Sequence, residues 1–454
     1  MSNNKPQTSY IVPMAIIAAL FFVFGFVTWL NGALIPFLKM ICDLTAFQAM
    51  LVASSFYAAY TVMALPSASV LERIGYKKGM ALGLLVIAAG ALIFIPAAYS
   101  RNFGVFLLGQ FVVGTGLTLL QTAVNPYVVK LGPSESAAVR ICIMGLLNKA
   151  AGVVAPIVFS ILVLSGITGA SESEVALLSE VAKNAKLNEL AGQLVTPYIG
   201  MAIVLAVLAV AMMFAPIPDI EDELTEGQDD SEVTLAGVFQ YPQLILGAIA
   251  LFFYVGVEVI AGDAIGLLGS QVGLDTAVAS MLTSYTMIFM VFGYLYGTFA
   301  IPRFMSQQTA LLLSAVMGIA FTFFVMYGST TSNSISASTL AMFGLPKIPN
   351  AVFFVALLGF ANAMVWPAIW PLALEGLGKY SSKGAALLIM GISGGAVLPL
   401  LYGHFADGSD VNAGQMAFVV TIPAYAFILF YAVKGHKIKS WSKKNSPAQQ
   451  EAKS

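Results

Sequence analysis

The sequence has few charged residues and few of the side chains that enzymes most often use for catalysis. Charged residues make up 9% of its 454 residues, whereas a soluble domain carries about 25%. There are only two histidines and two cysteines. Cys42 and Cys142 are far apart and lie at or within apolar stretches, so we expect neither a disulfide framework nor a metal site. The net charge of −1 gives no reason to expect nucleic-acid binding.

Catalytic and nucleotide-binding motifs are also missing. The chain contains no HExxH and no Walker loop, which argues against a metalloprotease and an ATP-driven pump. The stretch after residue 435 is short and basic, so no output domain of a sensor is expected there. We therefore predict that the protein is not an enzyme and uses no cofactor or metal.

Hydrophobic residues, in contrast, are abundant, at 59% of the chain with a mean hydropathy of +0.88. A membrane-spanning helix needs about 20 mostly apolar residues. Twelve such stretches occur, at approximately 12–38, 46–70, 79–98, 103–131, 137–165, 196–216, 238–268, 276–302, 308–328, 350–376, 383–405 and 414–434. The first is long enough to span and lacks a preceding basic region, so it is predicted to be a retained helix and not a signal peptide. The fold class predicted is an all-α membrane protein.

Three longer polar gaps divide these stretches, at 166–195, 217–237 and 329–349. The middle gap is strongly acidic and separates six helices from six. We predict an N-terminal six-helix bundle over 1–216, a cytoplasmic acidic linker over 217–237, a C-terminal six-helix bundle over 238–435 and a cytoplasmic basic tail over 436–454. A solvated tether is favoured for the linker, with a docking site as the alternative.

Lys and Arg predict the orientation, since they are enriched in cytoplasmic loops. With both termini in the cytoplasm, fifteen of the 21 Lys and Arg fall in inside segments. Five fall outside: Lys39, Arg101, Lys183, Lys186 and Lys347. The remaining one, Lys149, lies within a span. The bias indicates a multi-pass protein of a bacterial inner membrane with both termini cytoplasmic.

Repeated sequence patterns suggest that the chain has two similar halves. Leu131-Gly132 and Leu377-Gly378 are each followed twelve residues later by Ile-Met-Gly, at 143–145 and 389–391. Such repeats are typical of transporters built from related bundles. Arg73 and Arg303 occupy similar positions after two of the spans. They are predicted to act in cytoplasmic gating, with ordinary positive-inside topology as the alternative.

Polar side chains inside the spans predict a polar route through the protein. A charge deep in an apolar helix costs at least a few kcal/mol unless it faces a partner or water. Sugar hydroxyls are recognised by amides and carboxylates, and the apolar face of a sugar ring stacks on aromatic side chains. Candidate substrate-binding residues are Asn31, Gln121, Asn125, Asn148, Trp366 and Trp370; Trp29 adds another indole. The alternatives are interfacial anchoring for tryptophan and contacts between helices for asparagine.

Energy coupling needs a group that titrates or changes partners between two states. Lys149, Glu258 and Asp263 are the ionisable residues well inside the spans. We predict that Glu258 loads the proton and that Lys149 pairs with Glu258 or Asp263 across the two bundles. A static salt bridge that only fixes helix packing is the alternative.

Several segments together resemble one known family. They are FGFVTWLNGALIPFLK (24–39), QTAVNPYVVKLGP (121–133), the stretch from Arg140 to Asn148, YVGVE (254–258) and WPAIWPLALEGLG (366–378). In this order they resemble the fucose–galactose–glucose:proton symporter family of the major facilitator superfamily, and within it the bacterial glucose/galactose and N-acetylglucosamine permeases. The resemblance implies two pseudo-symmetric six-helix bundles, a central sugar site lined partly by Asn148 and Trp366, and alternating access driven by protons.

One departure from the family pattern affects the expected mechanism. The fucose permeases carry acidic residues at two positions that align with Gly32 and Gln121. Neither residue takes up a proton, so the coupling group must lie elsewhere. The expected function is proton-coupled symport of a glucose- or galactose-type hexose, with a small-molecule sugar, the proton and the lipid bilayer as partners. N-acetylglucosamine or fructose as the sugar, and sodium-coupled or facilitated transport, remain alternatives.

Overall fold

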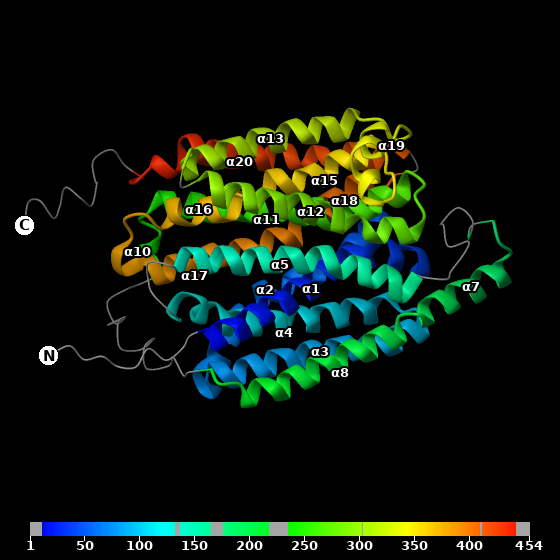
Figure 1. The fold of residues 1–454 in the computed structure, drawn as a ribbon, viewed down its shortest axis with the longest axis horizontal. Coiled ribbons are helices and arrows are strands. Elements are labelled where there is room, and N and C mark those ends of the chain that lie inside the picture. Colours follow the sequence, from blue (N-terminus) through cyan, green and yellow to red (C-terminus); the bar gives the residue numbers. More distant parts are fainter. Residues whose placement is uncertain are drawn as a thin grey trace, which may run out of the picture.

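The structure is a computed structural model that describes residues 11–131, 137–164, 175, 177–217, 235–301, 303–408 and 411–441. Within these residues every regular element is helical. Twelve helices are long and apolar enough to cross a membrane, as the sequence predicts. They form two bundles of six, and Figure 1 shows the second bundle lying above the first. The acidic linker falls almost entirely outside the described residues, so the predicted domain boundaries stay a prediction.

The first bundle consists of long, nearly continuous helices. They are α1 (Ile11–Cys42), α2 (Ala46–Ile74), α3 (Tyr76–Ser100), α4 (Phe103–Lys130), α5 (Ala137–Phe159) with a π-helical turn η2 (Ser160–Leu164), α7 (Glu180–Gly192) and α8 (Val195–Phe214). Polar caps set where several begin: Thr45 and Gln48 form a capping box before α2, and Asn102 accepts from Val105 N before α4. Such caps bond backbone N–H groups that the helix leaves unpaired.

The second bundle contains more interrupted spans. Its elements are α10 (Leu235–Val238), α11 (Pro242–Gln271), α12 (Thr276–Ala300), α13 (Gln307–Tyr327), α14 (Ser334–Ser338), η4 (Leu340–Phe343), α15 (Asn350–Asn362), α16 (Val365–Leu374), η5 (Gly378–Tyr380), α17 (Ser381–Met390), η6 (Gly391–Ser393), α18 (Gly394–Ala406), α19 (Val411–Met416), η7 (Ala417–Val420), α20 (Thr421–Val433) and η8 (Gly435–Lys437). Thus 350–376, predicted as one helix, is α15 followed by α16.

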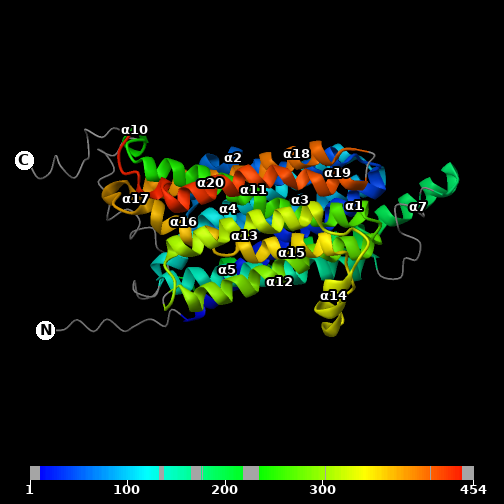
Figure 2. The ribbon, with the colours of Figure 1, turned by 90° about the horizontal axis from the view of Figure 1, so that it is seen from above.

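Two polar gaps contain helices that the hydropathy criterion missed. In the gap 166–195, α7 begins after Ser179, whose side chain accepts from Ala182 N, and it buries Leu187 and Leu190. Its apolar residues recur at helical spacing but are too few for a spanning segment. Figure 2 shows α7 extending beyond the bundles at one end, with α14 near the same end.

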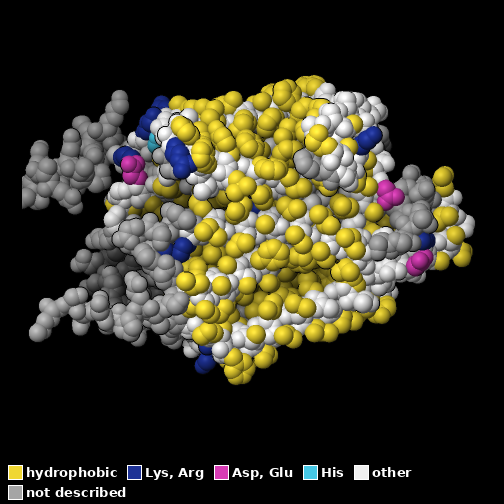
Figure 3. All heavy atoms as spheres, viewed as in Figure 1, with side chains coloured by type: hydrophobic (Ala, Val, Ile, Leu, Met, Phe, Trp, Pro, Cys, Tyr) yellow, Lys and Arg dark blue, Asp and Glu magenta, His cyan; other side chains and the backbone are white. Residues whose placement is uncertain are grey.

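We define the two ends of the molecule by the helices that begin or end there. The first end is where α1 begins and α20 ends, and the second end is the opposite one (Figure 1). Figure 3 shows a face covered mainly by hydrophobic side chains, with the visible charged side chains near the two ends. This distribution is the one expected for a protein that spans a bilayer.

The described part of the C-terminal tail packs against the first end of the second bundle. Lys439 Nζ lies 2.7 Å from Glu375 Oε2, and this contact lowers the pKa of the Glu375 carboxyl. Trp441 Nε1 donates to Phe239 O at 2.8 Å, and His436 is buried. The segment 436–441 is therefore attached to the bundle and does not hang free.

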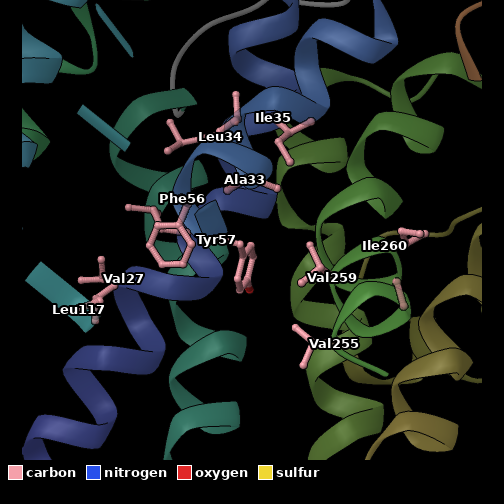
Figure 4. Close-up of a cluster of buried hydrophobic side chains, with 14 of the residues drawn as sticks. Val27, Ala33, Leu34, Ile35, Phe56, Tyr57, Leu117, Val255, Val259 and Ile260 are labelled. Atoms are coloured by element: carbon pink, nitrogen blue, oxygen red, sulfur yellow. The ribbon is translucent and has the colours of Figure 1, made fainter. Parts of the chain in front are cut away.

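The bundles pack together mainly through α5 against α12 and α2 against α18, and α1 packs against α11 and α12 between them. Figure 4 shows Tyr57 of α2 beside Val255 and Val259 of α11. Contacts between the bundles lie at the centre and toward the second end: Ala46 N donates to Asp407 Oδ1 at 3.0 Å, and Ser160 Oγ donates to Ala277 O at 3.2 Å. The bundles are thus joined at the second end.

Candidate functional site

A chain of polar and aromatic contacts crosses between the bundles at mid-molecule. Lys149 of α5 and Glu258 of α11 form an ion pair with Nζ and Oε1 2.6 Å apart. Each residue is only 8% exposed. The sequence left open whether Lys149 pairs with Glu258 or Asp263, and the structure brings it to Glu258.

Trp29 of α1 supports this ion pair from the side of the first bundle. Lys149 Nζ lies 4.4 Å from the centre of the Trp29 ring, a cation–π arrangement. Trp29 Nε1 in turn donates to Asn148 Oδ1 at 3.2 Å. The indole therefore orients two adjacent side chains of α5, one amide and one ammonium.

The second bundle extends the same network through aromatic side chains. Tyr254 OH donates to Glu258 Oε1 at 2.9 Å. The Tyr254 ring lies 6.2 Å from Trp366, and Trp366 lies 5.6 Å from Trp370. Both tryptophans are partly exposed, and the Trp370 Nε1 donor has no hydrogen-bond partner among the described residues. The network therefore ends in two indoles with partly exposed side chains and one unused, buried N–H donor.

Asp263 sits in a different environment from Glu258, although both are on α11. Five residues place the two carboxyls on different faces of the helix. Asp263 is 0% exposed, and neither of its carboxyl oxygens has a hydrogen-bond partner within the described part of the chain. An ionised carboxylate is very costly in such surroundings and tends to neutralise instead.

Among the described residues, the remaining predicted residues make no hydrogen bond or ion pair to this network. Asn31 is buried and accepts from Gln110 Nε2 at 2.9 Å, while its own Nδ2 lacks a partner among the described residues. Gln121 and Asn125 are partly buried on α4, and no hydrogen bond seen in the described residues joins them to the ion pair. Arg73 lies in the last turn of α2, and Arg303 follows α12 with its guanidinium 4.2 Å from the centre of the Phe299 ring.

The sequence analysis missed Tyr254, which belongs to the network, and Gln110, which contacts Asn31 outside it. Tyr254 precedes Glu258 by one helical turn, a spacing that puts both on one face and that could have identified it. Gln110 is a polar residue inside an apolar stretch, as Gln121 is, but it lay outside the motifs considered. Gln110 and Asn31 are 79 positions apart in the sequence. The sequence around each residue therefore does not indicate that they pair.

The bundles approach closely around Gly32 and Gly262, which makes this contact sensitive to size. A Cβ at Gly32 would overlap Thr283 Oγ1, whose hydroxyl already donates to Gly262 O at 2.6 Å. A Cβ at Gly262 would meet the Trp29 ring at 2.6 Å. Glycine at these positions therefore permits the close approach of α1, α11 and α12.

We expect Gly32→Ala to weaken the joined arrangement of the bundles, because the β-branched Thr283 side chain has little freedom to move aside. A loss of about 1–3 kcal/mol in stability is expected from such overpacking, measured as a lower melting temperature. Gly200→Ala is the matched control, since Gly200 is a helical glycine with open space around it. Equal melting temperatures for the two variants would contradict the prediction.

Comparison with known proteins identifies the family. The model of the Major Facilitator Superfamily matches residues 17–399. A glucose/galactose transporter of Brucella abortus is 33% identical over 439 residues, covering 96% of this chain and 97% of that protein. An L-fucose-proton symporter of Escherichia coli is 27% identical over 427 residues, covering 93% and 92%.

Solved structures agree on the fold. The crystal structure of the Escherichia coli fucose:proton symporter FucP matches with a TM-score of 0.67 at 23% identity, covering 96% of this chain and all of that one. The predicted twelve-helix architecture and the absence of an enzymatic role are confirmed by these relatives, which are transporters. The chain belongs to the major facilitator superfamily and, within it, to the fucose–galactose–glucose:proton symporter family.

Proposed function

We propose that the protein is a sugar transporter that couples the uptake of a glucose- or galactose-type hexose to the proton. The names of the glucose/galactose transporter and of the L-fucose-proton symporter support sugar as the substrate class and the proton as the coupling ion. The observation that carries the proposal is the buried Lys149–Glu258 pair between the bundles, which Tyr254 connects to the partly exposed indoles of Trp366 and Trp370. Transporters built from two related bundles bind their substrates between the bundles near mid-depth, and the position of this ion pair supports the proposal.

The side chains beside the ion pair have the chemistry that a sugar requires. Asn148 offers an amide already oriented by Trp29, and Trp366 and Trp370 offer ring faces for the apolar side of a pyranose. Glu258 supplies a second oxygen to accept from a hydroxyl. Asn31, Gln121 and Asn125 stay in the proposal as residues that line the route on α1 and α4.

The geometry favours separate roles for the two carboxyls of α11. Glu258 is held by Lys149 and Tyr254, so in this arrangement it serves as the partner of the cation. Asp263 has no partner among the described residues, so we assign the transported proton to it. The sequence analysis gave that role to Glu258. Glu258 stays in the mechanism as the carboxylate whose pairing with Lys149 changes between the two states.

Coupling then follows from the cost of burying a charge. Ionised Asp263 opposes closure of α1 and α12 over α11, whereas protonated Asp263 permits it. Rotation of the bundles separates Lys149, which belongs to the first bundle, from Glu258, which belongs to the second. The proton and the sugar thus each change the relative stability of the two arrangements, which is the requirement for coupling.

Orientation is part of the same proposal. The first end is assigned to the cytoplasm of a bacterium, in agreement with the distribution of Lys and Arg. Because the bundles are joined at the second end, this arrangement corresponds to an inward-facing state. Arg73 and Arg303, both near the first end, remain candidates for cytoplasmic gating contacts in the opposite state.

Uptake into proteoliposomes tests the function directly. We expect accumulation of glucose or galactose when an inward proton gradient is imposed, and no accumulation with a sodium gradient alone. A panel that includes N-acetylglucosamine and fructose separates the alternative substrates. Accumulation driven by sodium alone, or equilibration without accumulation under either gradient, would replace the proton symport with one of the alternatives.

A further inference from the structure

A groove of about 460 Å³ lies between α5 and α12 toward the first end. Farther toward the second end, Ser284 Oγ of α12 donates to Val153 O of α5 at 2.8 Å, and a Cβ at Gly145 would lie 3.4 Å from the Tyr294 ring. Beyond Gly145 the two helices leave the groove open between them. Its volume falls within the roughly 300–1,000 Å³ typical of sites for single small molecules.

The walls of the groove are apolar and open outward. They include Cys142, Ile143 and Leu146 of α5 and Leu295, Thr298 and Phe299 of α12. Ile143, Leu295 and Phe299 are 47%, 50% and 54% exposed. In a chain that spans a bilayer, side chains of this kind at such exposure face lipid. Acyl chains are therefore the molecules that have access to the groove.

One basic side chain closes the groove at its first end. Arg303 follows α12, lines the groove, and stacks on Phe299 at 4.2 Å. No carboxylate among the described residues pairs with its guanidinium. A guanidinium matches the geometry of a phosphate with paired hydrogen bonds. Basic pockets between membrane helices on the cytoplasmic side bind the head groups of anionic lipids.

We propose that this groove binds one anionic phospholipid, with an acyl chain between α5 and α12 and the phosphate on Arg303. The two helices belong to different bundles, so the lipid lies in a gap whose width changes when the bundles rotate. A bound lipid therefore favours the arrangement that is joined at the second end. The proposal depends on the membrane fold and not on which sugar is carried or which ion drives transport.

Native mass spectrometry of the full-length protein in detergent tests the binding. The protein is titrated with phosphatidylglycerol or with phosphatidylcholine of the same acyl chains. We expect one preferred phosphatidylglycerol per protein, and about fivefold weaker binding in Arg303→Gln, as expected for loss of one basic contact. Lys78→Gln is the matched control, because Lys78 is an exposed basic residue predicted at the same end but is not part of the groove.

The acyl chain is tested separately. Leu295→Trp fills the apolar wall at a half-exposed position, and it should weaken phosphatidylglycerol binding while Arg303 is intact. Equal binding of the two lipids, unchanged binding in Arg303→Gln, or an equal loss in Lys78→Gln would each overturn the proposal. Because the readout is binding, a failed sugar-uptake assay and a failed lipid site are distinguishable results.

Discussion

Lys149→Gln is expected to abolish sugar accumulation and to destabilise the folded protein. The substitution leaves the Glu258 carboxylate buried at 8% exposure without its ion-pair partner. Removing one partner of a buried pair costs about 3–5 kcal/mol. Glu258→Gln should be damaging for the reciprocal reason, because it leaves the Lys149 ammonium without its counter-ion. Thermal unfolding of the purified variants, together with uptake in proteoliposomes, measures both effects.

The double variant Lys149→Gln/Glu258→Gln separates stability from transport. It removes both charges and should regain much of the stability, with a coupling energy of about 2 kcal/mol between the sites, yet it should remain unable to accumulate sugar. The exposed Lys186–Glu189 pair at 3.3 Å is the matched control, for which a coupling of at most about 1 kcal/mol is expected. Active accumulation by the double variant would show that the pair only holds helices together.

Asp263→Asn is expected to convert a coupled transporter into one that only equilibrates sugar. Asparagine has nearly the same size and carries no titratable proton, so closure over α11 no longer depends on protonation. With one proton per sugar, a pH gradient of one unit supports about a tenfold sugar gradient. In the variant the ratio of internal to external sugar concentration should fall to one, while exchange of labelled for unlabelled sugar continues. Sugar-induced proton uptake, followed with a pH-sensitive dye, should disappear as well.

Asp407→Asn provides the control for this experiment. Asp407 is also an acidic residue at a contact between the bundles, but it is exposed and accepts from a backbone N–H, a role that an asparagine oxygen can fill. Its accumulation ratio should stay close to that of the unmodified protein. If Asp263→Asn still concentrates sugar under a proton gradient, the proton belongs to another group, with Glu258 the next to test.

Local patterns predicted most of the fold because the bilayer imposes a simple rule. A chain that crosses it must satisfy its backbone hydrogen bonds internally, so each long apolar stretch becomes a helix. Hydropathy alone therefore predicted the twelve membrane-spanning helices. Hydropathy predicted neither α7, which is too polar for the criterion, nor the break between α15 and α16. The break lies just before Pro367, which lacks an N–H and clashes with the carbonyl four residues earlier.

The sequence predicted which charged residues belong to the site but not which residues they contact, and this difference has a physical reason. The cost of charge in an apolar helix marked Lys149, Glu258 and Asp263 directly. Their partners could not be read in the same way, because Lys149 and Glu258 are 109 positions apart in the sequence. The sequence also did not show that Asn31, a candidate for sugar binding, accepts from Gln110, or that Trp29 contacts both Asn148 and Lys149.

The amino-acid sequence by itself determined that this protein crosses a membrane twelve times, which residues are too polar for lipid, and which family it resembles. These properties depend on composition and on short segments, whose transfer free energies are local. Only the tertiary structure decided that Lys149 pairs with Glu258 and that Asp263 has no hydrogen-bond partner within the described part of the chain. Both results depend on how two bundles from distant parts of the chain pack together, and no local free energy encodes that contact.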